Sequence, residues 1–144
     1  MTAPKATVAC RAVLRYEGRL LLVTDGNGYW YTPGGRLDSP ETLPQCVTRE
    51  VWEETGLRVT VGDVVAVSEF IDVSEGQHKV ECFFSAELVE PPAEVDDWQD
   101  IAGPVRSFGF FDDSELVAMN VQPQFLKSLG SSPGPLAHIY VQPN

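Results

Sequence analysis

Short apolar runs separated by turn-forming residues occupy the first part of the chain. Thr7–Tyr16 is rich in Val, Ala and Leu, and Arg19–Thr24 reads RLLLVT. Both runs have the length and composition of β-strands. The Glu-Gly pair at 17–18 predicts a tight hairpin turn between them. A short aromatic strand is expected at 29–31 (Tyr-Trp-Tyr), and the Pro-Gly-Gly at 33–35 is expected to break it.

The hydrophobic pattern then changes from strand to helix. Thr42 and Gln45 have the spacing of a capping box, in which each side chain bonds to the backbone N–H of the other residue. A helix is therefore expected from about Leu43 to Thr55, and Gly56 is expected to end it. Its apolar stripe, which must face the core, consists of Leu43, Val47 and Val51.

The rest of the chain predicts further strands and short helices. The expected strands are Val59–Asp72, His78–Leu88 and Ser107–Phe111, and the expected helices are Asp112–Met119 and Pro123–Leu129. Residues 131–144 either add a strand at Leu136–Val141 or form a flexible tail. One strong helix among strands predicts an α/β (α+β) domain with helices on a mixed β-sheet. The 144 residues fit one domain, 1–144.

The charge balance narrows the classes of partner. The chain has 10 Lys and Arg against 21 Asp and Glu, which gives a formal net charge of −11. A domain that reads nucleic acid usually carries a basic face, so no nucleic-acid partner is expected. An acidic protein can still act on phosphates if a bound divalent cation reverses the local field.

Cysteine usage and hydropathy predict the compartment. Cys10, Cys46 and Cys82 show no paired spacing, which argues against a disulfide framework and structural zinc. The sequence has no apolar run of a signal peptide and no stretch long enough to span a membrane. The expectation is a soluble, cytoplasmic protein without a membrane partner.

Three glutamates on the predicted helix are the first candidates for chemistry. Glu50, Glu53 and Glu54 have the spacing i, i+3, i+4, which places them within about 100° of one helix face. The apolar stripe lies beside them, so the carboxylates border the core. Such a cluster is costly unless a positive charge is present, and clustered hard oxygen ligands suit Mg²⁺ or Mn²⁺. In isolation, an acidic solvent-exposed helix face explains the same pattern.

The wider segment Gly35–Leu57 resembles the Nudix box, G-x5-E-x7-R-E-U-x-E-E-x-G-U, without a gap. The matching residues are Gly35, Glu41, Arg49, Glu50, Val51, Glu53, Glu54, Gly56 and Leu57. Seven of these positions require one amino acid, and chance agreement is on the order of 10⁻⁸ per starting site. The resemblance extends less specifically over about Thr7 to Leu129. It implies a Nudix-type α/β/α sandwich around a central mixed β-sheet.

The resemblance also implies roles for individual residues. Glu50, Glu53 and Glu54 are expected to bind Mg²⁺ or Mn²⁺ together with the backbone carbonyl near Gly34, and Arg49 is expected to hold the carboxylates by a bidentate pairing. Glu41 is expected to support the loop and the start of the helix. The general base is left open between Glu53, Glu54, Glu81 and the acidic residues Asp96, Asp97 and Asp100.

The sequence offers four candidates for substrate contacts. The candidates are Arg36, Glu41, Arg11 and Asp100. Arg11 is in a strand among small apolar residues, and we favour the solvent-exposed face of the sheet over the substrate cleft for it. Trp30, Phe70, Phe83 and Phe108 could stack on a base, although aromatic residues in strands more often belong to the core.

The resemblance implies metal-dependent hydrolysis of a small nucleotide. The leading prediction is cleavage of the diphosphate that links a nucleoside to another moiety, as in ADP-ribose or a nucleotide sugar. The alternative enzyme is a nucleoside triphosphate pyrophosphohydrolase of the nucleotide-sanitising type. A third hypothesis is a non-catalytic nucleotide-binding module. A homodimer is compatible with the sequence and is not required by it.

Overall fold

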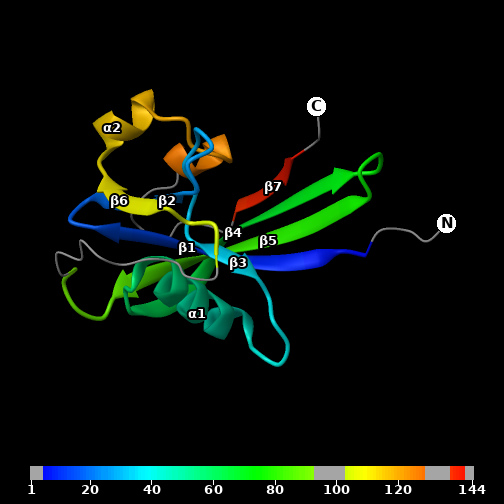
Figure 1. Cartoon of the computed structure of the whole chain (residues 1–144), viewed down its shortest axis with the longest axis horizontal. Coiled ribbons are helices and arrows are strands. Elements are labelled where there is room, and N and C mark those ends of the chain that lie inside the picture. Colours follow the sequence, from blue (N-terminus) through cyan, green and yellow to red (C-terminus); the bar gives the residue numbers. More distant parts are fainter. Residues whose placement is uncertain (1–4, 93–102, 129–136, 142–144) are drawn as a thin grey trace.

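The computed structural model describes residues 5–92 and 103–128 in full and the backbone of 137–141. The elements follow the order β1 (Thr7–Tyr16), β2 (Arg19–Thr24), β3 (Gly34–Arg36), α1 (Leu43–Thr55), β4 (Val59–Asp72), β5 (Gln77–Leu88), β6 (Ser107–Phe111), α2 (Asp113–Ala118), a 3₁₀ helix η1 (Gln124–Ser128) and β7 (Ala137–Val141). Figure 1 shows α1 below the strands and the two short helices above them.

The strands form one mixed sheet in the order β6-β2-β1-β5-β4-β7, and β3 pairs with β1 beside this path. The β1–β5 and β4–β7 pairs are parallel, whereas the other pairs are antiparallel. β1 therefore lies at the centre, where it contacts β2, β3 and β5. The predicted α+β class with a mixed sheet is confirmed.

Two hydrophobic cores lie on opposite faces of the sheet. Leu21 belongs to the core between the sheet and α1. Its neighbours Leu20 and Leu22 belong to the core between the sheet and the helices α2 and η1. This alternation follows the two-residue period of a strand. The expected α/β/α sandwich is confirmed, with helical elements on both faces (Figure 1).

Local sequence signals fix both ends of α1. The hydroxyl of Thr42 accepts a hydrogen bond from the backbone N–H of Gln45 at 3.3 Å, and the Gln45 side chain accepts one from the N–H of Thr42 at 2.8 Å. Gly56 ends the helix in the left-handed region, at φ 72°, where glycine is favoured. The predicted bounds are confirmed, and they fix which residues of the helix face the sheet.

The predicted aromatic strand at 29–31 is wrong. Trp30 and Tyr31 form only isolated bridges, to Val121 and Val23, and the ordered strand is β3. A Cβ atom at Gly34 would lie 2.2 Å from the backbone oxygen of Cys10. The glycines expected to break the strand therefore allow the close approach that forms β3.

Other predictions near turns and chain ends are confirmed with small changes. Glu17 and Gly18 both have positive φ, 51° and 77°, as expected for a tight hairpin turn. The C-terminal strand is present as β7, parallel to β4. The last short helix is a 3₁₀ helix over Gln124–Ser128. Within the residues that the structure describes, no helix is both long and apolar enough to cross a membrane.

Candidate active site

The three glutamates of α1 differ in exposure as the helix turns from the core towards solvent. Glu54 is buried at 5% exposure, the Glu50 side chain is 17% exposed and the Glu53 side chain is 48% exposed. Val47 and Val51, on the adjacent stripe, are fully buried. The carboxylates therefore border the core as predicted.

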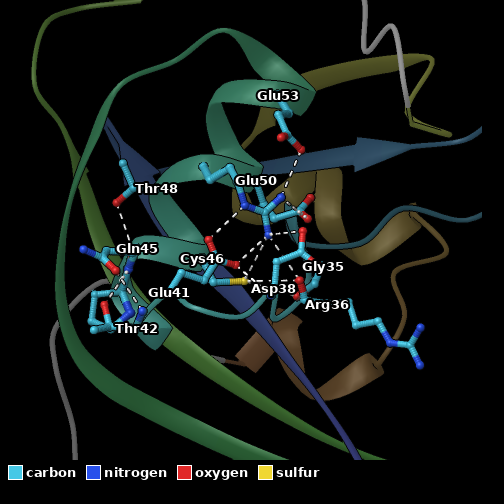
Figure 2. Close-up of polar contacts among 12 residues, drawn as sticks. Gly35, Arg36, Asp38, Glu41, Thr42, Gln45, Cys46, Thr48, Glu50 and Glu53 are labelled. Atoms are coloured by element: carbon cyan, nitrogen blue, oxygen red, sulfur yellow. Dashed lines mark hydrogen bonds and ion pairs between the residues drawn. The ribbon is translucent and has the colours of Figure 1, made fainter.

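Arg49 is the centre of a polar network that joins the loop before α1 to the glutamates. Figure 2 shows the carboxylates of this network, Glu41, Glu50 and Glu53. Its Nε and Nη2 atoms donate to the two carboxylate oxygens of Glu41, at 3.0 and 2.7 Å. Its Nη1 atom donates to Glu50 at 3.0 Å and to Glu53 at 3.2 Å. The bidentate partner of Arg49 is thus Glu41, and Glu50 and Glu53 share one nitrogen.

This network divides the acidic residues into two kinds. Hydrogen bonds from Arg49 and from the backbone of Asp38 lower the pKa of Glu41 to about 2, so this group stays charged. Burial raises the pKa of Glu50, although its bond to Arg49 opposes that effect. Glu41 is therefore a fixed structural anion. Glu50 is a desolvated carboxyl that a further positive charge would stabilise.

Two glycines bring the carboxylates up to strand β3. The backbone N–H of Gly34 donates to the buried Glu54 carboxylate at 2.9 Å. A Cβ atom at Gly35 would lie 2.7 Å from the carboxylate of Glu50. Gly35 thus leaves the space that the Glu50 carboxylate occupies, and the backbone of Gly34 holds Glu54.

The glutamates open into a cavity of about 750 Å³. Its wall includes side chains from β1, β4, β5 and the 29–31 segment as well as α1. The residues with polar or aromatic side chains in the lining are Arg11, Tyr29, Tyr31, Glu50, Glu53, Glu54, Ser68, Phe70, Gln77, Lys79, Glu81 and Gln122. A cavity of this size matches a nucleotide-sized ligand.

Arg11 lines this cavity, and the favoured prediction of the solvent-exposed face is wrong. Its Nε donates to Glu81 at 2.5 Å and its Nη1 to the carbonyl of Thr32 at 3.0 Å. The guanidinium carbon lies 5.6 Å from the centre of the Tyr31 ring. Glu81 is 70 residues away in sequence, so its pairing with Arg11 is not visible locally. Burial raises the pKa of Glu81, but Arg11 outweighs it and holds that pKa below its ordinary value.

The aromatic candidates separate into core and cavity residues. Phe83 is fully buried, and Trp30 and Phe108 pack against the two cores. Phe70 lines the cavity. Tyr29 and Tyr31 line it too, with their ring centres 5.6 Å apart, and sequence reasoning did not single them out.

Two further predicted residues, Glu41 and Arg36, lie outside this cavity lining. Glu41 is engaged by Arg49, and Arg36 is an exposed residue of β3 that lines a second hollow. Asp96, Asp97 and Asp100 lie outside the described residues. Sequence reasoning also missed Ser68 and Lys79, which line the cavity. Ser68 of β4 pairs with Glu81 of β5, and Lys79 of β5 pairs with Phe70 of β4. Only the strand pairing reveals that relationship.

The donor set fits a hard divalent cation. Three carboxylates from one helix and the adjacent Gly34–Gly35 backbone provide only oxygen ligands, as Mg²⁺ and Mn²⁺ prefer. In the described part of the chain, no three acidic, histidine or cysteine side chains form a ready-made metal cage. Arg49 donates to one carboxylate oxygen of Glu50 and to one of Glu53, and both side chains line the cavity.

The family model described as NUDIX domain matches residues 3–122. The chain belongs to the NUDIX family. Its Nudix box, Gly35–Leu57, comprises the last two residues of β3, the following loop, α1 and the helix end at Gly56 and Leu57. The network around Arg49 is therefore the structural core of that box.

Individual relatives agree with this assignment. A MutT-like protein of Streptomyces ambofaciens is 50% identical over 56 residues, which cover 38% of this chain and 36% of the relative. Phosphatase NudJ of Escherichia coli is 36% identical over 74 residues, 49% of this chain and 47% of the relative. The chain thus matches less than half the length of these curated relatives. The crystal structure of a Nudix hydrolase from Nitrosomonas europaea has a TM-score of 0.73 at 19% identity, over 99% of this chain and 81% of that one, and shows the shared fold.

Proposed function

We propose that this member of the NUDIX family is a hydrolase that cleaves the diphosphate of a nucleoside diphosphate linked to another moiety, with Mg²⁺ or Mn²⁺ as cofactor. ADP-ribose and nucleotide sugars are the expected kind of substrate. One observation carries the proposal: Glu50, Glu53 and Glu54 line the same cavity as the cation Arg11 and the aromatic ring of Tyr31. The site thus provides metal ligands, an anion contact and a base-stacking surface.

Glu50, Glu53 and Glu54, with the backbone carbonyl of Gly34, are the proposed metal ligands. A bound cation supplies an activated water and neutralises charge on the diphosphate oxygens. The protein's own contribution is positioning. Gly34 fixes Glu54 by a hydrogen bond, and Arg49 fixes Glu41 and thereby the loop beside the glutamates.

We assign proton acceptance from the attacking water to Glu53. Its side chain is the most exposed of the three glutamates, whereas Glu54 is buried and bonded to Gly34. Glu81 is the less suitable base because Arg11 and Lys79 both pair with its carboxylate. These pairings favour a role for Glu81 in holding Arg11 towards the diphosphate.

Tyr29, Tyr31 and Phe70 form the proposed contact with the base. They line the cavity that contains the glutamates, and stacking on such rings tolerates different bases. Arg11 lies against the ring of Tyr31, which places an anion-binding group next to a stacking surface. A nucleoside and its diphosphate would use these two groups together.

The alternative substrate is a nucleoside triphosphate, whose phosphates would meet the same glutamates and Arg11. Product analysis separates the two functions. Cleavage of a linked diphosphate releases a nucleoside monophosphate and a phosphorylated partner. Cleavage of a triphosphate by the alternative reaction releases inorganic diphosphate.

The test is a panel of ADP-ribose, UDP-glucose and nucleoside triphosphates, with Mg²⁺ or Mn²⁺, analysed by ³¹P NMR. Metal-dependent release of a nucleoside monophosphate from a linked diphosphate supports the proposal. Release of inorganic diphosphate from triphosphates alone supports the alternative. Tight nucleotide binding without products under either metal would favour a binding module and reject both reactions.

A further inference from the structure

The cations of this acidic chain are unevenly distributed. Of the 10 Lys and Arg residues, four line one hollow of about 550 Å³: Lys5, Arg11, Arg36 and Lys79. Among the described residues, no Asp or Glu lines this hollow. A local excess of positive charge on a chain of net charge −11 indicates a binding site for an anion.

Strand register explains how the cations are gathered. Arg36 of β3 pairs with Ala9 of β1, and Lys79 of β5 pairs with Thr7 of β1. Partners in register project to the same face of a sheet, so Arg36 and Lys79 flank the smaller side chains of Ala9 and Thr7. Thr7 and Ala9 thus lie between Arg36 on the β3 side and Lys79 on the β5 side, where Glu81 is the partner of Ala9 and contacts Lys79.

Two of the four cations are available to a ligand. Neither Arg36 nor Lys5 forms an ion pair with any residue in the described ranges, and both are exposed. Figure 2 shows the Arg36 side chain extending away from the carboxylate network around Arg49. Lys79 contacts Glu81 at 3.6 Å, and its side chain is 43% exposed. The hollow therefore has more positive charge than its own neighbours neutralise.

The hollow is continuous with the active-site cavity. Arg11, Gly35, Gln77 and Lys79 line both. Arg11 and Lys79 lie at the boundary, where both pair with Glu81. A molecule whose diphosphate lies beside the glutamates can therefore extend past this boundary to Arg36 and Lys5.

We propose that this hollow binds a second anionic group, a phosphate carried by the substrate away from the cleaved diphosphate. The inference rests on the proposed function, because the cavity locates the diphosphate. It selects, within the linked nucleoside diphosphates, those with an additional phosphate on the nucleoside or on the linked moiety. Free inorganic phosphate offers the same chemistry to the hollow.

The first experiment uses inorganic phosphate without divalent metal, so it does not depend on hydrolysis. Phosphate is titrated into the ¹⁵N-labelled protein, and amide shifts are followed at Gly35, Gly76 and Lys79. Saturable shifts at these residues are expected, with binding weakened roughly fivefold in Arg36→Gln and again in Lys5→Gln. Arg58→Gln, which removes an exposed cation elsewhere, is the control. Equal binding in all variants, or shifts spread over the whole surface, would overturn the site.

The second experiment uses two substrates that differ by one phosphate. NADPH and NADH share an internal diphosphate, and kcat/KM is measured for both with Mg²⁺. The wild type is expected to favour NADPH, and the preference should fall about fivefold in Arg36→Gln and remain in Arg58→Gln. Equal preference in wild type and Arg36→Gln would overturn the substrate assignment. If phosphate binds at the hollow and neither nucleotide is cleaved, the anion site stands and the proposed hydrolysis of these substrates fails.

Discussion

Arg49 holds the carboxylate of Glu41 with two hydrogen bonds, from Nε at 3.0 Å and from Nη2 at 2.7 Å. The two residues lie eight positions apart, one in the loop and one on α1. Their pairing therefore fixes the loop against the helix that carries the glutamates. It leaves Nη1 of Arg49 to contact Glu50 and Glu53.

Replacing Arg49 with lysine tests the geometry of this pairing. An ammonium group keeps the charge and loses the planar fork that binds both oxygens of Glu41. Arg49→Lys should lower kcat by about tenfold or more, with a stability loss of about 1 kcal/mol. Steady-state kinetics and urea unfolding measure the two effects. Arg58→Lys, whose partner Glu90 is exposed, should change neither; equal effects in both variants would contradict the assignment.

The Glu41 carboxylate predicts how stability depends on pH. Its pKa is about 2 in the folded protein, below the ordinary value of 4.5, so the folded state binds this proton only at a lower pH than the unfolded state does. The stability from this group is present above pH 4.5 and is lost as pH falls from 4.5 towards 2. The difference in unfolding free energy between wild type and Glu41→Gln should therefore shrink over this range. A constant difference between pH 6 and pH 3 would refute the paired anion.

Gly35 tests the close contact between β3 and Glu50. A methyl group there would lie 2.7 Å from the Glu50 carboxylate. This carboxylate is the end of a flexible side chain, so it can turn aside. Gly35→Ala should lower activity by tenfold or more by displacing Glu50, with a smaller loss of stability. Thermal unfolding and kcat of the same preparation provide the comparison.

Gly34 provides the contrasting case. A methyl group there would lie 2.2 Å from the backbone oxygen of Cys10, and a backbone atom of a central strand cannot move aside. Gly34→Ala should therefore destabilise the fold far more than Gly35→Ala. If the two variants unfold at the same temperature, the proposed difference between side-chain and backbone contacts is wrong.

Arg11 and Glu81 form a pair whose side chains are 16% and 12% exposed. Removing one partner leaves the other desolvated, at a cost of about 3 kcal/mol. Arg11→Met and Glu81→Gln should each destabilise the protein, and the double variant should lose less stability than the sum of the two. Urea unfolding of all four proteins measures this coupling. Additive losses would show that the two side chains are not energetically coupled.

Features set by neighbouring residues could be predicted from the sequence. Thr42, Gln45 and Gly56 specify the ends of α1 within a few residues, and the Nudix box follows from the spacing of its glutamates. The cavity walls depend on strand pairing over long distances. Arg11 meets Glu81 across 70 residues, so its single-strand pattern could not distinguish the cavity from solvent. Strand pairing also places Lys79 in the cavity, and it brings Arg36 and Lys79 together in the hollow that Lys5, Arg11, Arg36 and Lys79 line.

The roles of Glu53 and Glu54 are tested by charge removal. Glutamine keeps the size of each side chain and an oxygen that can accept the hydrogen bond from Gly34, so both variants should fold. We expect kcat to fall by a factor on the order of 10²–10⁴ in each. Glu90→Gln, on the exposed Arg58 pair, is the matched control and should keep wild-type activity. Wild-type turnover in Glu53→Gln and Glu54→Gln would reject both assignments.

Manganese anomalous diffraction tests the metal site most directly. Crystals of the wild type and of Glu53→Gln/Glu54→Gln are soaked in MnCl₂ and measured at the manganese absorption edge. We predict an anomalous peak bounded by the carboxylates of Glu50, Glu53 and Glu54 in the wild type and no peak there in the double variant. An active wild type without density beside these three glutamates would contradict the account.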